Sequence, residues 1–275
     1  MNSKQILYLL TIALLLTSCS SMYIPAVRSI PLLEKKGEFQ AEGGISTNSV
    51  YANVSAAITN DIAVSANGNL SYRNFSDRYD LFTHKDAEEP TGLLEPDLRG
   101  KFSHRYIEAG IGKINIHPSF PMKLELFGGA GMGIATDVVS NSRYDHDGNY
   151  KTNYYSIFAQ GNLGLKKRIV EAGASVRLTY SIFNYTANLY NNDEDDDFFK
   201  KRLSNVGIEP MLFGRVGGNN LKAVLRIGIN LMPPISYGDE KISRYHGLSG
   251  LGYTMFHYSL GVSYRIGGNK SHKFH

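Results

Sequence analysis

The chain has 275 residues and carries 29 lysines and arginines against 25 aspartates and glutamates, for a net charge of +4. These charges are scattered and form no basic stripe, which argues against nucleic acid as a partner. A single cysteine allows no intrachain disulfide, and beyond the amino-terminal stretch no segment is long and apolar enough for a transmembrane helix. A chain of this kind, rich in glycine and tyrosine, would enter a membrane only as a β-barrel.

Residues 1–18 are predicted to be a lipoprotein signal peptide. Lys4 precedes an apolar stretch, 6–16, that is too short to span a bilayer but has the length of the apolar region of a secretory signal. Residues 16–19, Leu-Thr-Ser-Cys, resemble the lipobox of bacterial lipoproteins. This resemblance implies cleavage before Cys19, a lipid on its thiol and an acylated new amino terminus. An ordinary secretory signal with an incidental cysteine is the alternative.

Residues 19–36 are predicted to be a periplasmic tether that connects the lipid to the first strand. Pro25 and Pro31 would interrupt regular structure there. Surface-export signals in some Gram-negative bacteria place acidic residues directly after the cysteine, whereas residues 20–22 here are Ser-Ser-Met. We therefore expect an anchor at the periplasmic leaflet of the outer membrane. The segment that leads from this anchor into the first strand resembles the corresponding segment of lipid-anchored barrel proteins of Gram-negative envelopes.

From residue 37 onward, apolar and polar residues alternate with a period of two. The clearest segment is 170–183, where even positions are apolar and odd positions are polar except for Phe183. The other segments with this pattern are 38–46, 49–59, 62–72, 104–117, 122–137, 153–167, 205–217, 221–231 and 256–266. The pattern predicts about ten strands, with 8 or 12 as alternatives, in a barrel over 37–267 that is followed by a short periplasmic tail, 268–275.

Two all-β architectures share this alternation: a soluble sandwich or lipocalin-like barrel with the apolar face inside, and a transmembrane barrel with the apolar face outside. Three features favour the antiparallel up-and-down transmembrane β-barrel. The polar faces are mostly Gly, Ser and Asn with isolated charges. Tyrosines recur near strand ends on the apolar faces, at Tyr72, Tyr155, Tyr180 and Tyr264. Tight joins alternate with long ones, which we expect to be extracellular loops, at 73–103, 139–152, 185–204 and 232–251.

Isolated charges on the polar faces are expected to point into the lumen. A barrel of about ten strands is largely filled by side chains, so these charges should form ion pairs across strands. They form a predicted lumen ion-pair network, either structural or lining a selective pore, of Glu171, Arg177, Glu209, Arg215, Arg226 and Arg265.

His257 and Ser259 lie on one face of the last predicted strand. They faintly resemble the His-x-Ser pair of outer-membrane lipid A deacylases, in which histidine activates serine. Leu260 replaces the asparagine that follows the serine in that family, and no carboxylate follows Ser259. We expect a weak polar pair and no catalytic residue in this chain.

An acidic run, Asp193, Glu194, Asp195, Asp196 and Asp197, lies in one expected extracellular loop. It lacks the spaced ligands and turn glycine of a calcium loop, and residues 145–149 resemble such a loop only superficially. Both are expected to be solvated charge, with no metal and no cofactor other than the lipid on Cys19.

The sequence therefore predicts a non-enzymatic outer-membrane β-barrel lipoprotein, a structural or accessory component of the envelope. Its contacts would be outer-membrane lipid and, through its loops, an envelope protein complex or an extracellular ligand. A narrow, porin-like pore for small solutes or ions is the first alternative, and a lipid or peptide hydrolase at the barrel rim is the second.

Overall fold

The computed structural model describes residues 26–47, 49–75, 98–116, 122–141, 146–191, 197–232 and 256–267. These residues form ten strands: β1 (Phe39–Ser46), β2 (Val50–Ala57), β3 (Ile62–Phe75), β4 (Leu98–Lys113), β5 (Lys123–Asn141), β6 (His146–Lys166), β7 (Val170–Asn191), β8 (Asp197–Gly217), β9 (Leu221–Ile229) and β10 (Phe256–Ile266). Within this part of the chain, no helix has the length and apolar character needed to cross a membrane.

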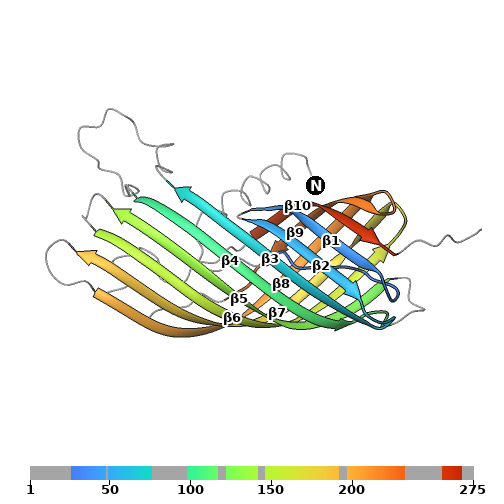
Figure 1. The fold of residues 1–275 in the computed structure, drawn as a ribbon, viewed down its shortest axis with the longest axis horizontal. Helices are drawn as coiled ribbons and strands as arrows, with labels where there is room; N and C mark the ends of the chain where they lie inside the picture. Colours follow the sequence, from blue (N-terminus) through green and yellow to red (C-terminus); the bar gives the residue numbers. More distant parts are fainter. Residues whose placement is uncertain are drawn as a thin grey trace, which may run out of the picture.

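The strands close into a single antiparallel barrel in which neighbours in sequence are neighbours in space (Figure 1). β1 completes the circle by pairing with β10, from Phe39 opposite Ile266 to Ser46 opposite Ser259. Each strand therefore has a neighbour on both sides, although residues 197–207 of β8 have no ladder partner on the β9 side within the described part of the chain. The predicted all-β, up-and-down barrel of ten strands is confirmed.

The two ends of the barrel differ in their connections. At one end, here called the tight-turn end, the strands are joined through residues 58–61, 114–122, 167–169 and 218–220. β1 begins and β10 finishes at this end. At the opposite end, here called the long-connection end, the joins are 47–49, 76–97, 142–145, 192–196 and 230–255.

β5 to β8 run further toward the long-connection end than the sequence predicted. The expected loops 139–152 and 185–204 are mostly strand, with Val139 paired to Gly148 and Tyr185 to Lys201. Outward side chains in these extensions include the exposed Lys151 and Arg202, so the apolar alternation stops although the ladder continues. The remaining joins, 142–145 and 192–196, and most of the expected loops 73–103 and 232–251, lie outside the described residues.

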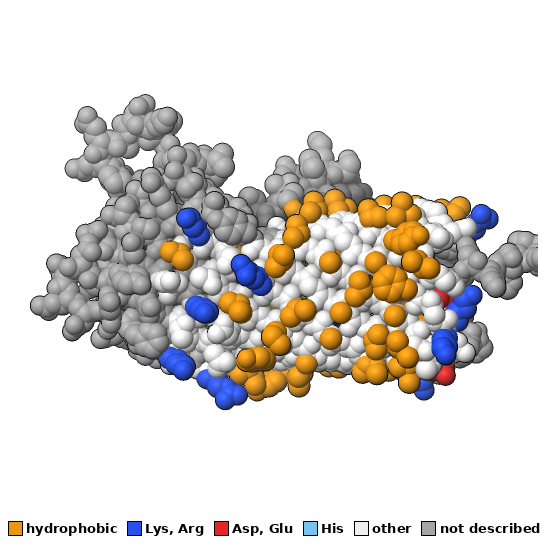
Figure 2. All heavy atoms as spheres, in the orientation of Figure 1, with side chains coloured by type: hydrophobic (Ala, Val, Ile, Leu, Met, Phe, Trp, Pro, Cys, Tyr) orange, Lys and Arg blue, Asp and Glu red, His pale blue; other side chains and the backbone are white. Residues whose placement is uncertain are grey.

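Side chains alternate across the wall with the apolar set outside. Figure 2 shows these apolar side chains as a broad band across the visible face of the barrel, with lysine and arginine beyond both of its margins. Ile107, Ile157 and Leu212 are 60%, 60% and 65% exposed, whereas the inward Glu108, Ser156 and Phe213 are buried. This is the arrangement of a transmembrane barrel and the reverse of a soluble one.

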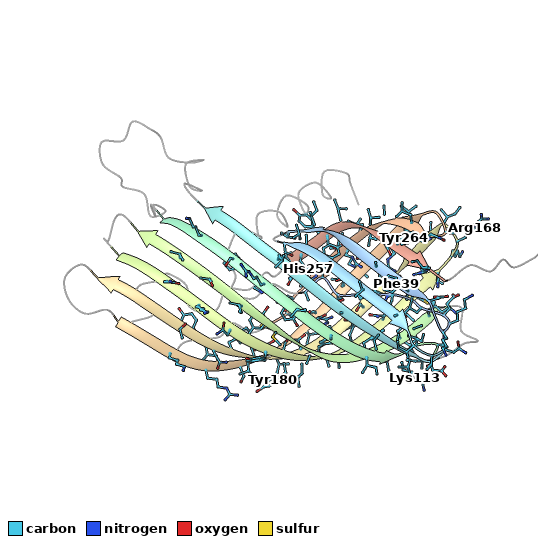
Figure 3. The ribbon with its side chains drawn as sticks, viewed as in Figure 1. Phe39, Lys113, Arg168, Tyr180, His257 and Tyr264 are labelled. Carbon is cyan, nitrogen blue, oxygen red and sulfur yellow. The ribbon has the colours of Figure 1, made fainter. Side chains whose placement is uncertain are left out.

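The wall is low on one side and tall on the other. β1, β2, β9 and β10 have 8, 8, 9 and 11 residues, whereas β5 to β8 have 19 to 22. In Figure 1 the tall strands extend well beyond the short ones toward the long-connection end. Figure 3 accordingly places Lys113 and Arg168 at the tight-turn end and His257, near the start of β10, about halfway along the molecule.

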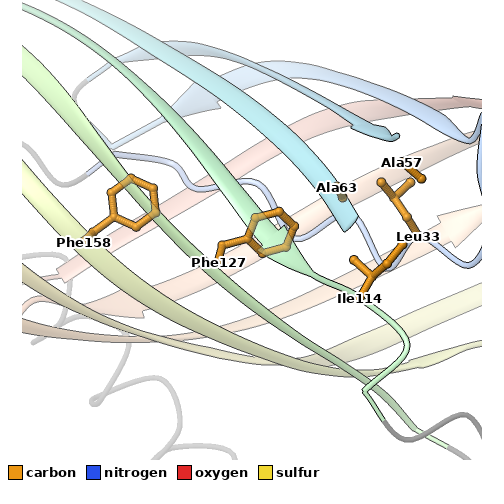
Figure 4. Packing of buried hydrophobic residues seen from close by; sticks show 6 residues of the cluster. All are labelled: Leu33, Ala57, Ala63, Ile114, Phe127 and Phe158. Atoms are coloured by element: carbon orange, nitrogen blue, oxygen red, sulfur yellow. The ribbon is translucent and has the colours of Figure 1, made fainter. Parts of the chain in front are cut away.

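Residues 26–34, here called the lumen segment, precede β1 and lie inside the barrel. Ala26, Val27, Ile30, Leu32 and Leu33 are at most 4% exposed. Leu33 packs in a cluster with Ala57, Ala63, Ile114, Phe127 and Phe158 of the wall (Figure 4). A second cluster joins Ile30 and Leu32 to Met211 and Phe213. These residues therefore form part of the barrel core, not the external tether expected from the sequence.

Candidate functional site: the barrel lumen

Polar side chains of the wall bind the backbone of the lumen segment at consecutive residues. The carbonyl oxygens of residues 29–32 each accept a hydrogen bond from a different side chain: Gln160 Nε2 (2.8 Å), Arg215 Nη2 (2.6 Å), Arg265 Nη2 (2.8 Å) and Lys166 Nζ (3.0 Å). Because carbonyls inside a barrel are removed from water, these donors offset a desolvation cost of about 1–3 kcal/mol per group. The wall thus holds an extended peptide through its backbone.

Backbone donors of the lumen segment are also satisfied, by glutamates near the tight-turn end. The amide of Leu33 donates to Glu125 Oε1 at 2.9 Å, and the amide of Glu34 donates to Glu38 Oε2 at 3.0 Å. Asn115 Nδ2 donates to the carbonyl of Glu34 at 2.6 Å. The segment is therefore bound from Ser29 to Glu34 without a regular strand pairing.

Two side chains of the lumen segment contact the wall directly. Arg28 Nη2 lies 3.1 Å from Glu209 Oε2 on β8, with both side chains fully buried, and Arg28 Nη1 also donates to the Glu209 carbonyl. The hydroxyls of Ser29 and Ser55 are 2.7 Å apart. Removing one partner of a fully buried ion pair leaves an uncompensated charge, so Arg28 and Glu209 constrain the position of the segment strongly.

A network of charges lies beside residues 30 and 31 of the lumen segment. Glu171 Oε2 and Oε1 accept from Arg215 Nη1 (3.1 Å) and Arg265 Nη1 (2.8 Å), and Arg215 Nη2 lies 3.3 Å from Glu42 Oε2. Glu42 also pairs with Arg226. Each arginine is thus matched by carboxylates on β1 or β7, which offsets the cost of burying these charges.

A second network lies higher in the lumen, around Arg177. Its guanidinium binds Glu108 through two bonds, Nη1 to Oε2 at 2.9 Å and Nη2 to Oε1 at 2.7 Å. Gln160 Oε1 accepts from Arg177 Nε at 3.0 Å, and the guanidinium carbon lies 4.2 Å from the centre of the Phe158 ring. Through Gln160, this network reaches the Ser29 carbonyl of the lumen segment. A two-pronged arginine–carboxylate pair of this kind has a strongly fixed geometry.

Inward aromatic rings lie flat against glycines of the neighbouring strand. His104, Tyr106, Tyr154 and Phe183 form a column in which His104–Tyr154 and Tyr106–Tyr154 centroids are 5.9 and 5.6 Å apart. A Cβ at Gly131 would meet the Tyr106 ring, and a Cβ at Gly133 would meet the Tyr154 ring. Glycine at these positions therefore gives the rings room, which explains part of the glycine content of the inner face.

The predicted network residues all point into the lumen, but their pairing differs from a simple Glu–Arg ladder. Arg177 lies opposite Glu209 in the β7–β8 register, yet its guanidinium binds Glu108, and Glu209 binds Arg28. Arg226 binds Glu42. Glu42 and Glu108 could have been found, because Glu108 is the lone acid on the inward face of its predicted strand and Glu42 shares that face of its strand only with Glu38. Arg28 is unusual for a solvated tether, because it stands within the apolar run Ala-Val-Arg-Ser-Ile-Pro-Leu-Leu.

His257 and Ser259 are both buried on the inner face of β10. Neither ring nitrogen of His257 has a hydrogen-bond partner among the described residues, so the imidazole does not engage the Ser259 hydroxyl. Its ring instead lies against Gly228 of β9. Within the described residues, no group of three or more His, Cys, Asp or Glu is placed to hold a metal. Cys19 and residues 193–196 of the acidic run lie outside the described residues.

The barrel resembles solved outer-membrane proteins at low similarity. These include a major outer membrane protein from Thermus thermophilus, with TM-score 0.41 and 9% identity over 83% of this chain and 98% of that one. Another is the translocator domain of the autotransporter NalP from Neisseria meningitidis, with TM-score 0.40 and 10% identity over 82% and 86%. OmpT of Vibrio cholerae gives a TM-score of 0.21 with 8% identity over 86% and 100%. No protein-family model and no curated protein matches the chain.

Proposed function

We propose that this protein is a non-enzymatic outer-membrane β-barrel lipoprotein, anchored by a lipid on Cys19, that serves as a structural or accessory component of the envelope. The outward apolar band supports the membrane location, because so large an exposed apolar surface is unfavourable in water and suits lipid. The resemblance of residues 16–19 to a lipobox supports the lipid.

Charge on the outer wall supports an orientation with the long-connection end outside the cell. Lys101, Arg105 and Lys151 are exposed on β4 and β6 beyond the apolar band, and Lys200 and Arg202 occupy the same zone on β8. Among the residues that Figure 2 draws in colour, such cations stand on this side without a neighbouring aspartate or glutamate on the visible face. Phosphate-bearing lipid headgroups match this chemistry. Beyond this zone, the long strands and their connections would present the surface for an envelope protein or an extracellular ligand.

The observation that carries the proposal is that the lumen is occupied by the chain itself. Residues 28–34 bind the wall through ion pairs and backbone hydrogen bonds to β5, β6, β8 and β10. Around them the two networks add buried ion pairs to the lumen. A pore needs a continuous water path, whereas this arrangement favours a closed barrel that acts through its surfaces.

Conductance in planar bilayers tests this proposal. We expect the purified full-length protein to show no steady single-channel current, and a variant lacking residues 26–33 to show openings, because the deletion removes the segment from the lumen. Arg28→Gln keeps the segment and weakens one end of it, so we expect brief openings. Heat-modifiable migration on gels confirms that each variant is a folded barrel. Steady conductance of the full-length protein would instead support the pore.

A further inference from the structure

The contacts of the lumen segment give its direction through the barrel. Glu34 lies at the tight-turn end, where its carbonyl accepts from Asn115. Leu33 contacts Glu125, the third residue of β5, and the Ile30 carbonyl contacts Arg215, two residues before β8 ends. Arg28 contacts Glu209, eight residues before that end. Going from residue 34 back to residue 28, the chain therefore moves steadily away from the tight turns.

Arg28 lies level with the upper edge of the low side of the wall. The β8–β9 ladder pairs Met211 with Gly228, and a bridge joins Ile208 to Leu231, so Glu209 faces the position just after β9 ends at Ile229. β10 begins at the same level, with Phe256 opposite Ile229. At the height of Arg28 the short strands have already ended, whereas β4 to β8 continue.

We propose that the amino-terminal segment passes through the lumen and emerges at the long-connection end, so that Cys19 and its lipid lie on that side of the membrane. This inference rests on the lipidated membrane barrel proposed above. It replaces the anchor at the periplasmic leaflet that the sequence suggested, because that anchor would require the chain to turn back through the lumen.

Chain length supports this direction. Seven residues separate Ala26 from Cys19, which allows at most about 25 Å when fully extended. Eight residues of strand from Glu209 to Gly217 correspond to about 26 Å along the strand, or roughly 20 Å along a barrel axis with the usual tilt of about 40°. A return to the tight-turn end would use nearly the whole length and leave too little to pass around the wall into lipid.

The return path is also occupied. The carbonyls of residues 29–32 already accept from four wall donors in this part of the lumen, Gln160, Arg215, Arg265 and Lys166. A returning stretch of chain would need its own backbone partners there. The wall residues that pack against Leu33 and Ile30 are already covered by these two side chains. By contrast, the seven residues between Ala26 and Cys19 are long enough to pass over the low edge formed by β9 and β10. They can then reach the membrane leaflet at the long-connection end.

Single cysteines labelled on whole cells test the inference without changing the chain length. The Cys19 thiol is blocked by its lipid, so Tyr23→Cys and Met22→Cys would each carry the only reactive thiol. Asp195→Cys in the join 192–196 and Lys270→Cys after β10 report the two ends of the barrel. Each variant is treated with a membrane-impermeant maleimide before and after the outer membrane is opened.

We expect Tyr23→Cys and Met22→Cys to label in intact cells with Asp195→Cys, and Lys270→Cys to label only after opening. The inference is overturned if the two amino-terminal thiols follow Lys270→Cys, or if both stay silent in intact cells while Asp195→Cys reacts. If Lys270→Cys alone reacts in intact cells, the proposed orientation fails. In that case, amino-terminal thiols that show the same labelling as Asp195→Cys would still support passage of the segment through the lumen, but with the barrel in the opposite orientation.

Discussion

Arg28 of the lumen segment and Glu209 of β8 form a fully buried ion pair at 3.1 Å across 181 residues of sequence. Neither position suggests the other in the sequence, because Arg28 precedes the first strand and Glu209 lies in the eighth. The pair joins the part of the chain that enters the lumen to the wall that surrounds it. Because the pair fixes the lumen segment against the wall, the position of the segment can be tested by crosslinking and mutation.

A disulfide should form between the lumen segment and β2. The Ser29 and Ser55 hydroxyls are 2.7 Å apart, so cysteines at both positions can approach closely enough to bond. We expect Ser29→Cys/Ser55→Cys to oxidise in the folded barrel, seen as a mobility change on non-reducing gels and confirmed by mass spectrometry. Ser29→Cys/Ser204→Cys is the matched control, because Ser204 is exposed on β8. Failure of the first pair to oxidise, in a folded barrel, would place residues 26–34 outside the lumen.

Glu108 and Arg177 should be strongly coupled. Glu108→Gln leaves the buried Arg177 guanidinium without its carboxylate, and we expect a loss of about 3–5 kcal/mol in the free energy of unfolding. Arg177→Gln should cost a similar amount, and the double variant should cost less than the sum of the two. Urea unfolding in lipid vesicles measures this cycle, with the exposed Lys101→Gln as control. Simple additivity would mean that the two side chains do not interact.

Arginine on the outer face of β9 should be costly at mid-strand and tolerated near the end. Leu225 and Leu221 are 48% and 56% exposed on that face. If the band lies in lipid, Leu225→Arg should cost about 2–4 kcal/mol and Leu221→Arg about 0–1 kcal/mol. Unfolding from vesicles measures both. Equal, small effects at the two positions would argue against a lipid-facing band.

Glycines under aromatic rings should not tolerate a methyl group. Gly133→Ala places a Cβ against the Tyr154 ring, which must move within a packed column, at an expected cost of about 1–3 kcal/mol. Gly214→Ala is the control, because nothing lies within 4 Å of a Cβ there. Thermal unfolding in detergent compares the two. A stable Gly133→Ala protein would show that the column adjusts freely.

Lipid attachment should depend entirely on Cys19, the only cysteine of the chain. Cys19→Ala should abolish incorporation of labelled palmitate and slow removal of the signal peptide, while Ser18→Ala should leave both intact. Metabolic labelling followed by immunoprecipitation gives the answer. Label in the Cys19→Ala protein would refute the lipobox interpretation.

The number of strands could be predicted from the sequence. The side of the wall to which most residues point could be predicted as well, because apolar and polar residues alternate with a period of two. Leu225 and Arg226 are an example, exposed and buried as expected. The upper parts of β6 and β8 could not be found in this way. There the outer face carries Lys151 or Arg202, which removes the apolar contrast while backbone pairing continues.

Which carboxylate pairs with each arginine of the lumen could not be predicted from the sequence either. The facing of Arg177 is set by its strand, but its carboxylate partner is set by which side chains meet across the interior. Glu108 lies on β4, three strands away from β7, and reaches Arg177 across the lumen rather than along the wall. The burial of residues 26–34 depends on the same three-dimensional arrangement. A proline-containing stretch beside a signal gives little indication of it.

The backbone contacts of the lumen segment also include the last strand of the barrel. The carbonyls of Ile30 and Pro31 are held by Arg215 and Arg265, and Arg265 stands next to the last residue of β10. The Pro31 carbonyl therefore gains its partner only when the final strand has been made, whereas Arg28, Ser29 and Ile30 have partners on β2, β6 and β8. A chain that stops short of β10 lacks both the closing strand and one of the side chains that hold the interior. Closure of the wall and the contact that holds Pro31 therefore both depend on the same strand, β10.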